Sequence, residues 1–185
     1  MTQQMYFQRF TAPEQHQLLG QIDEVRLNLQ AAESMDDPRQ VLEAAGVLGS
    51  MLTTASKEAQ ARELLLNYLP LAQQNESTEE VGWFLLALAT ANQYLERREE
   101  ANEQFSEALR RARDHRWERL KHFVLHHWGR SLVEEGRLIE ARECFVEALY
   151  LRESMNEPFQ ASTREALAAL DEIERGSRNL QGPID

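Results

Sequence analysis

The chain has 185 residues, of which 42% are hydrophobic and 28% charged, and its formal net charge is −11 at pH 7. This length suits one domain with a substantial core, and the composition is that of a globular protein rather than a disordered or membrane-embedded one. The negative charge argues against general binding to nucleic acid or anionic membranes, since both require a basic surface. Gly and Pro are few, whereas Ala, Leu, Glu, Gln and Arg dominate, so the chain is predicted to be mostly helical.

The cysteine content and the apolar runs indicate a cellular compartment. Cys144 is the only cysteine, which excludes an internal disulfide and fits a reducing environment. The opening MTQQMYFQRF lacks the pattern of a secretory signal. The longest apolar run, WFLLALATA at 83–91, is less than half the length of a membrane-spanning helix. We therefore expect a cytoplasmic protein that does not bind membranes.

The first predicted element is a single leading helix at about 13–34, preceded by an N-terminal segment at 1–12. Leu18, Ile22, Val25 and Leu29 fall on one stripe of that helix. Since the repeats described next begin at 38, this helix has no partner of its own and should pack against the first of them.

Three segments then align without a gap at a spacing of 40 residues, beginning at Leu48, Leu88 and Trp128. The matching columns alternate small and bulky side chains at helical spacing, which lets neighbouring helices approach closely. They predict three antiparallel helix pairs at 38–77, 78–117 and 118–157. The columns are Gly49, Ala89 and Gly129; Ala61, Ala101 and Ala141; Leu65, Phe105 and Phe145; Leu69, Leu109 and Leu149.

Glycine and proline residues indicate the remaining helix boundaries. Gly136 in EEGR, 134–137, is expected to end the first helix of the third pair. Pro38 and Pro158 lie three periods apart, each at the predicted first turn of a helix. The second of these helices, at 158–175, should cap the array, and residues 176–185 should form a flexible tail.

The repeat resembles the tetratricopeptide repeat family, in its extended 40-residue form of bacterial type. The third copy carries the resemblance best, with Trp128, Gly129, Ala141, Phe145 and Leu149 in the family's positions. The resemblance implies an all-α, right-handed superhelical solenoid of antiparallel helix pairs. The family's period is about 34 residues, so a period of 40 requires longer helices or looser turns.

The resemblance also implies where a ligand would lie, because the first helix of each pair lines the concave face in this family. The candidate partner-binding residues are then Trp83, Leu86, Thr90 and Tyr94 from the second copy and Phe123, His126, His127 and Arg130 from the third. The alternative is that Trp83 and Phe123 pack between helices. The family's carboxylate clamp for chaperone tails has no match, since Gly46 and Ser50 occupy its places.

Residues 110–130 form a basic window in an otherwise acidic chain. Seven cations face two carboxylates there, a net charge of +5 that leaves −16 for the rest of the chain. Such a field favours an acidic partner, with Arg116 and Arg119 as further contacts. The competing interpretation is that Arg110, Arg111 and Arg113 end a helix and pair with glutamates one turn away.

The same window contains KHFVLHHWGR, in which His122 and His126 are four residues apart and Glu118 is one turn further back. Two or three ligands on one helix are a weak metal signal, and Cys144 falls in the packing stripe of another helix. No catalytic motif is present. We therefore expect no metal, no cofactor and no enzymatic activity.

The sequence thus favours a non-catalytic adaptor, scaffold or regulator that binds a peptide or protein of acidic character. Two alternatives stay open: a neutralising, immunity-type binder of a basic protein through the acidic surface, or a sensor of a small molecule or peptide. The aromatic N-terminus, with Tyr6, Phe7 and Phe10, either docks on the array or forms a homodimer contact. The identity of the partner does not follow from these residues.

Overall fold

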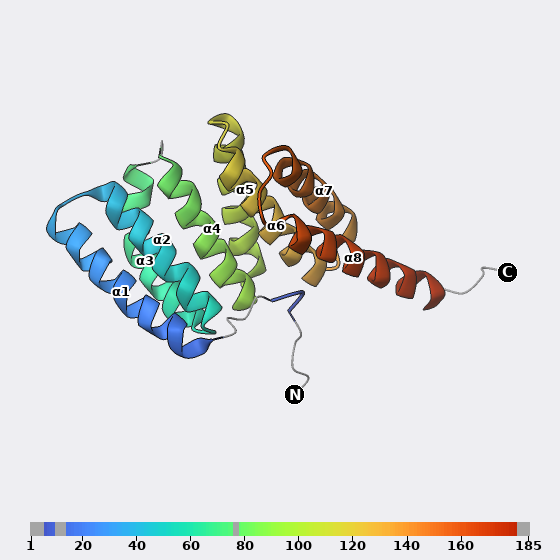
Figure 1. Ribbon diagram of the computed structural model, residues 1–185, viewed down its shortest axis with the longest axis horizontal. Coiled ribbons are helices and arrows are strands. Elements are labelled where there is room, and N and C mark those ends of the chain that lie inside the picture. The colour runs from blue at the N-terminus through green and yellow to red at the C-terminus, as the bar shows by residue number, and fades with distance from the viewer. Residues whose placement is uncertain (1–5, 10–13, 76–77, 181–185) are drawn as a thin grey trace. The chain divides into compact units, whose positions relative to one another are not determined.

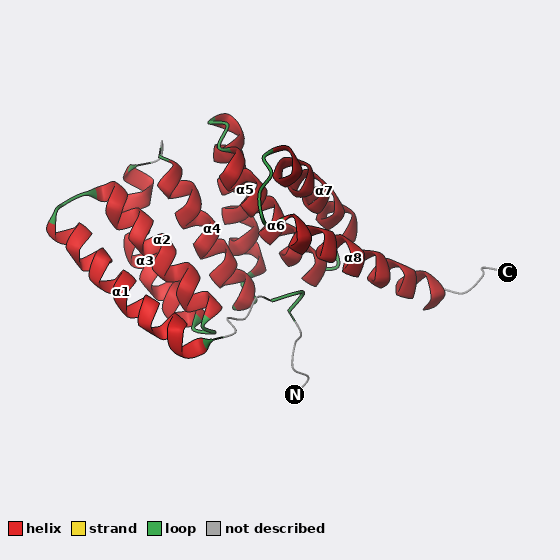
Figure 2. Ribbon diagram, viewed as in Figure 1, coloured by secondary structure: helices red, strands yellow, loops and turns green. Residues whose placement is uncertain are grey.

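The computed structural model describes residues 6–9, 14–75 and 78–180. These residues form α-helices joined by short connections, with no strand among them, as Figures 1 and 2 show. The first five helices pack on their neighbours in chain order, as do the last two, so the predicted all-α class is confirmed. The helices are α1 (Gln15–Ser34), α2 (Pro38–Thr54), α3 (Glu58–Gln74), α4 (Glu79–Tyr94), α5 (Arg98–Asp114), α6 (Glu118–Glu134), α7 (Leu138–Ser154) and α8 (Gln160–Leu180).

The chain divides into two compact units. Arg9–Leu120 form the N-terminal unit, whereas Lys121–Asp185 together with Met1–Gln8 form the C-terminal unit. The division therefore falls inside the first turn of α6. In the N-terminal unit α2 packs against α1, α3 and α4, and α4 packs against α3 and α5.

The 40-residue period is a doubled step of 20 residues. Five of the helices contain 17 residues each, α2, α3, α5, α6 and α7, and three residues connect the helices within a pair. These helices are longer than a period of about 34 residues would allow, which is one of the two expected causes of the long period. The step is also visible in the backbone, because the residues with a positive φ at the helix ends are separated from one another by 20 residues or a multiple of 20. They are Asp36, Ser56, Glu96, Arg116, Gly136 and Asn156.

Each of these residues ends a helix in the same way. The amide after it donates to the carbonyl five residues earlier, as from Lys57 to Leu52 and from Arg137 to Leu132, both at 2.9 Å. This is the Schellman arrangement, which satisfies carbonyls that the helix end would leave without partners. Glycine suits the left-handed position best, and Gly136, with a φ of 75°, ends α6 as the sequence predicted.

Small residues on the first helix of a pair receive bulky residues from the second. A Cβ placed on Gly129 would lie 2.7 Å from a ring carbon of Phe145, and one on Gly49 would lie 2.6 Å from a methyl group of Leu65. Both distances are well inside van der Waals contact. The aligned small and bulky residues are therefore in direct contact in the first and third helix pairs.

The ends of the array differ in detail from the prediction. Pro38 begins α2 as expected, and the Asp37 side chain caps that helix by accepting from the amides of Arg39 and Gln40. Pro158, in contrast, lies in a turn, and α8 begins at Gln160. The helix then continues to Leu180, beyond the predicted end at 175. Most of the N-terminal segment 1–12 and the last five residues lie outside the described residues.

The close fit at Gly129 makes a prediction for stability. Gly129→Ala should lower the free energy of unfolding by about 1–2 kcal/mol, because overpacking against Phe145 outweighs the gain in helix propensity. Gly20→Ala is the matched control, since a Cβ there meets no atom within 4 Å, and it should raise stability by about 1 kcal/mol. Urea unfolding of both variants measures the difference. Equal stabilisation by the two substitutions would contradict the packing at Gly129.

Candidate functional site

The described part of the N-terminal segment docks through Phe7 on α6 in the C-terminal unit. Arg130 Nε donates to the Phe7 carbonyl at 3.0 Å, and the Phe7 amide donates to Glu134 Oε1 at 3.1 Å. The Phe7 ring lies 6.2 Å from the Phe145 ring, centroid to centroid. We call this arrangement of Arg130, Glu134 and Phe145 around residue 7 the Phe7 seat.

The Phe7 seat follows from helical spacing. Arg130 and Glu134 are four residues apart on α6, so their side chains emerge on one face. Phe145 belongs to an apolar cluster formed with Leu132, Ala141, Ala166 and Leu170, and Phe7 packs against that cluster. A cation and a carboxylate therefore contact the backbone carbonyl and the backbone amide of one residue, while the core contacts its ring. The contacts at this seat are therefore made to the main chain and to one apolar side chain.

Beside this seat lies a guanidinium that is almost completely buried. The Arg152 side chain on α7 is 1% exposed, and its Nε donates to His122 Nδ1 at 3.1 Å. Its Nη1 donates to the Phe159 carbonyl at 2.9 Å and to the hydroxyl of Thr163. The guanidinium carbon also lies 5.5 and 5.7 Å from the Phe123 and Phe159 ring centroids, at cation–π distance.

One of these bonds fixes the proton position of a histidine. His122 Nδ1 accepts from Arg152 directly, so Nδ1 is the acceptor in that ring and the neutral ring carries its proton on Nε2. The Thr163 hydroxyl, which accepts from Arg152, also lies 3.2 Å from His126 Nδ1, and a hydroxyl can donate to that nitrogen or accept from it. The bond from Arg152 to His122 is thus incompatible with a charged His122.

Burial of this cluster also sets the direction of its titration. Burial lowers the pKa of Arg152 from 12.5 to about 10, against the attraction of Glu157. Burial, followed by the positive charges nearby, lowers the pKa of His126 well below its usual value, and it lowers the pKa of His127 to about 3. Arg152 is therefore the cation of the cluster at neutral pH, and His126 and His127 are neutral.

The predicted partner-binding residues of the C-terminal unit are distributed around this cluster. His126 and Arg130 are buried, at 8% and 5% exposure, and contact Thr163 and Phe7 respectively. Phe123 packs edge-on against Phe159, with ring centroids 5.2 Å apart. His127 is half-buried, and its ring lies edge-on to that of His126. Arg130 therefore contacts the docked segment directly.

The predicted residues of the N-terminal unit are mostly engaged in its own packing. Trp83 Nε1 donates to Glu79 at 3.1 Å, Leu86 is buried, and the Thr90 hydroxyl donates to the Leu86 carbonyl. Tyr94 is 8% exposed, and its ring lies 4.3 Å from the guanidinium carbon of Arg9. Tyr94 thus contacts the N-terminal segment through Arg9.

The basic window is largely paired with carboxylates. Arg110 binds both Glu107 and Asp114, and Arg111 also binds Glu107, at 2.7–2.8 Å. Lys121 lies 2.9 Å from Glu147. Arg116 and Arg119 are exposed, and Arg116 occupies the left-handed position that ends α5. The interpretation of the window as ion-paired helix surface therefore holds for Arg110 and Arg111.

Sequence reasoning did not single out Arg152 or Thr163. Arg152 lies in the last turn of α7, where a cation normally interacts with the helix end and stays exposed. Only the turn that follows α7 and the start of α8 bring Ser162, Thr163 and the Phe159 carbonyl within reach of it. No periodic pattern in the sequence encodes that approach.

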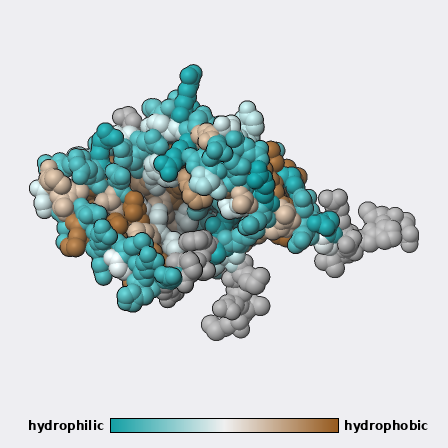
Figure 3. Space-filling view, in the orientation of Figure 1, coloured by the Kyte–Doolittle hydropathy of each residue, from teal (hydrophilic) through white to brown (hydrophobic). Residues whose placement is uncertain are grey.

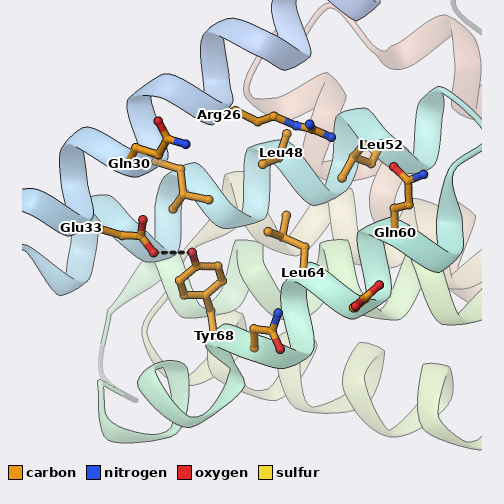
Figure 4. Close-up of a pocket in the computed structure, with 11 residues that line it drawn as sticks. Arg26, Gln30, Glu33, Leu48, Leu52, Gln60, Leu64 and Tyr68 are labelled. Atoms are coloured by element: carbon orange, nitrogen blue, oxygen red, sulfur yellow. Dashed lines mark hydrogen bonds between the residues drawn. The ribbon is translucent and has the colours of Figure 1, made fainter.

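Two open clefts lie in the N-terminal unit. The first, of about 370 Å³, runs between α1 and α3 over Leu48 and Leu52 of α2, as Figure 4 shows. At its edge the Tyr68 hydroxyl donates to Glu33 at 2.6 Å, and burial raises the Tyr68 pKa to about 12. The second, of about 390 Å³, lies between α3 and the turn that connects α4 to α5. Neither cleft includes any of the predicted partner-binding residues.

Ten large hydrophobic side chains are exposed among the described residues. Leu27, Ile139 and Tyr150 are 65%, 77% and 70% exposed. On the face seen in Figure 3, hydrophobic residues form small separate patches among hydrophilic ones. Among the described residues, no group of three or more His, Cys, Asp or Glu side chains could hold a metal ion. No helix in the same ranges has the length and apolar content to cross a membrane.

No family model and no curated protein sequence matches this chain. Among solved structures, the chain is similar to BtubC (BKLC) from P. vanneervenii, with a TM-score of 0.70 and 18% sequence identity. The match covers 91% of this chain and 78% of that one. At this identity the similarity concerns the fold alone, and it agrees with an all-α arrangement of helices packed in sequence.

The neutral histidines make stability depend on pH. The pKa of His126 is lower in the folded state, so the unfolded chain binds more protons as the pH falls below about 6.5, and stability falls with it. His126→Asn keeps an acceptor near the Nδ1 position but cannot titrate. Between pH 6 and pH 5, the free energy of unfolding should therefore fall less steeply in the variant than in the wild type, by about 1.4 kcal/mol per pH unit.

Urea unfolding at pH 7, 6 and 5 measures this slope. His16→Asn is the control, because His16 is exposed on α1, and it should follow the wild-type slope. Parallel curves for the wild type and His126→Asn would contradict a His126 that is kept neutral by burial and by the positive charges nearby.

Proposed function

We propose that this protein is a non-catalytic interaction module, a tetratricopeptide-like adaptor or scaffold that binds a short segment of a partner protein on α6. The observation that supports the proposal is the Phe7 seat, in which α6 already holds a peptide segment of this chain by its main chain and one aromatic ring. The cytoplasm is the compartment proposed for it, from the single cysteine.

The chemistry of the Phe7 seat indicates what a partner segment would need. Arg130 and Glu134 contact backbone groups, which every residue except proline offers in full. Phe145 and the apolar cluster around it contact the ring, so the position equivalent to Phe7 should be aromatic or large and apolar. The arginines of the basic window support an acidic partner less strongly, since Arg110 and Arg111 pair with Glu107 and Asp114.

The same contacts imply competition. A segment attached to the chain has an effective concentration on the order of millimolar at its own seat. A partner segment must therefore displace residue 7, and weakening the attached segment should strengthen binding of a free peptide. This consequence separates a binding seat from a purely structural contact.

The test uses full-length Phe7→Ala protein and a capped Tyr-Phe-Gln-Ala tetrapeptide, with the Arg130 Nε–H resonance as the NMR readout. The peptide should bind this variant at least ten-fold more tightly than the wild type. Phe7→Ala with Glu134→Ala should lose the binding, because the acceptor for the peptide amide is gone. Glu143→Ala is the matched control, since Glu143 is exposed on α7, and it should leave binding unchanged. No binding to Phe7→Ala, or equal binding with and without Glu134, would overturn the proposal.

A further inference from the structure

Arg9, two residues after Phe7, is held in the N-terminal unit by a separate set of contacts. Its Nη2 donates to the Thr53 carbonyl at 3.0 Å and to the Ser56 hydroxyl at 3.2 Å, and it forms an ion pair with Glu58. Its guanidinium carbon lies 4.3 Å from the centroid of the Tyr94 ring. We call Thr53, Ser56, Glu58 and Tyr94 the Arg9 seat.

The residues of the Arg9 seat come together for reasons independent of Arg9. Thr53 is in the last turn of α2, Ser56 is the left-handed residue that ends it, and Glu58 begins α3. Tyr94 is the last residue of α4, and α4 packs against both α2 and α3. The seat is thus built by the standard turn and by the regular packing of three helices, so it persists when its occupant leaves.

The chemistry of the Arg9 seat selects a guanidinium. A carbonyl at a helix C-terminus and a carboxylate both favour a cation. The planar guanidinium can stack on an aromatic ring while its edge donates to several acceptors at once, whereas an ammonium is a compact point charge that remains strongly hydrated. The two charged side chains are mostly withdrawn from water, with 17% of Arg9 and 15% of Glu58 exposed, so removal of the cation would leave a half-buried carboxylate without its partner.

We infer that the Arg9 seat is a guanidinium-binding subsite for an arginine side chain of a partner peptide. The chain's own Arg9 occupies the subsite when no partner is bound. The inference deepens the proposed function, on which the existence of a partner rests, because it gives that partner a basic residue. It also departs from the acidic partner that the basic window suggested. The subsite itself can be tested without any partner peptide.

The experiment uses the full-length protein and three small probes with uncharged ends: N-acetylarginine amide, N-acetyllysine amide and N-acetylcitrulline amide. Calorimetry measures affinity, and the ring resonances of Tyr94 report the location. Arg9→Ala should bind the arginine probe at least ten-fold more tightly than the wild type, in which the attached arginine competes. The lysine probe should bind more weakly, and the neutral citrulline probe should not bind measurably.

Two further variants make the result specific. Gln8→Ala, which changes an exposed neighbour of Arg9, should behave as the wild type. Arg9→Ala with Glu58→Gln should lose binding of the arginine probe at least ten-fold. Should Arg9→Ala lose its helical circular dichroism, Arg9→Gln replaces it, because it retains a longer side chain in the seat.

Absence of arginine binding by the variant that lacks Arg9, or equal binding of arginine and citrulline, would overturn the inference. Neither result would affect binding of the tetrapeptide to the Phe7 seat, since that peptide carries no arginine. Conversely, arginine binding that depends on Glu58 would stand even if the Phe7 seat bound no free peptide.

Discussion

A buried guanidinium must have its donors satisfied, and that requirement organises the unit that carries the candidate site. Arg152 has almost no contact with water, and leaving it without acceptors would cost several kcal/mol. Its acceptors come from α6, from the turn before α8 and from α8 itself. The same bonds therefore align three elements, place α8 two residues later than the proline pattern suggested, and hold the Nδ1 atom of His122 as an acceptor.

This arrangement determines how α6 can interact with a peptide. Two histidines of α6, His122 and His126, are turned to internal bonds, whereas Arg130 and Glu134 reach the docked segment. A cation and an anion one helical turn apart match the carbonyl and the amide of a single residue. These contacts are therefore made to backbone groups, and the neighbouring ring of Phe145 favours an aromatic side chain at this position.

The repeat could be predicted from the sequence because its signal is periodic. The columns that pair Gly129 with Phe145 and Gly49 with Leu65 are the contacts found between the helices, and the turn at Gly136 follows from its conformational freedom.

The site was harder to predict, because helical periodicity shows which side chains share a face but not which distant segment covers it. Leu86, Tyr94, His126 and Arg130 were placed on an open groove, whereas each is buried, and Tyr94 and Arg130 contact residues 9 and 7. The docking of Phe7 was one of two alternatives for the N-terminus, and nothing in the sequence encodes the Arg152 network. As partner-binding residues, all of these remain predictions.

The central claim is that α6 holds the main chain of residue 7 through Arg130 and Glu134, and amide hydrogen exchange tests it most directly. In NMR measurements of hydrogen exchange, the Phe7 amide should exchange at least ten-fold more slowly than an amide in an unstructured peptide, since it donates to Glu134. Glu134→Ala should remove that protection, and Glu143→Ala should retain it. A Phe7 amide that exchanges at the unstructured rate in the wild type would contradict the account.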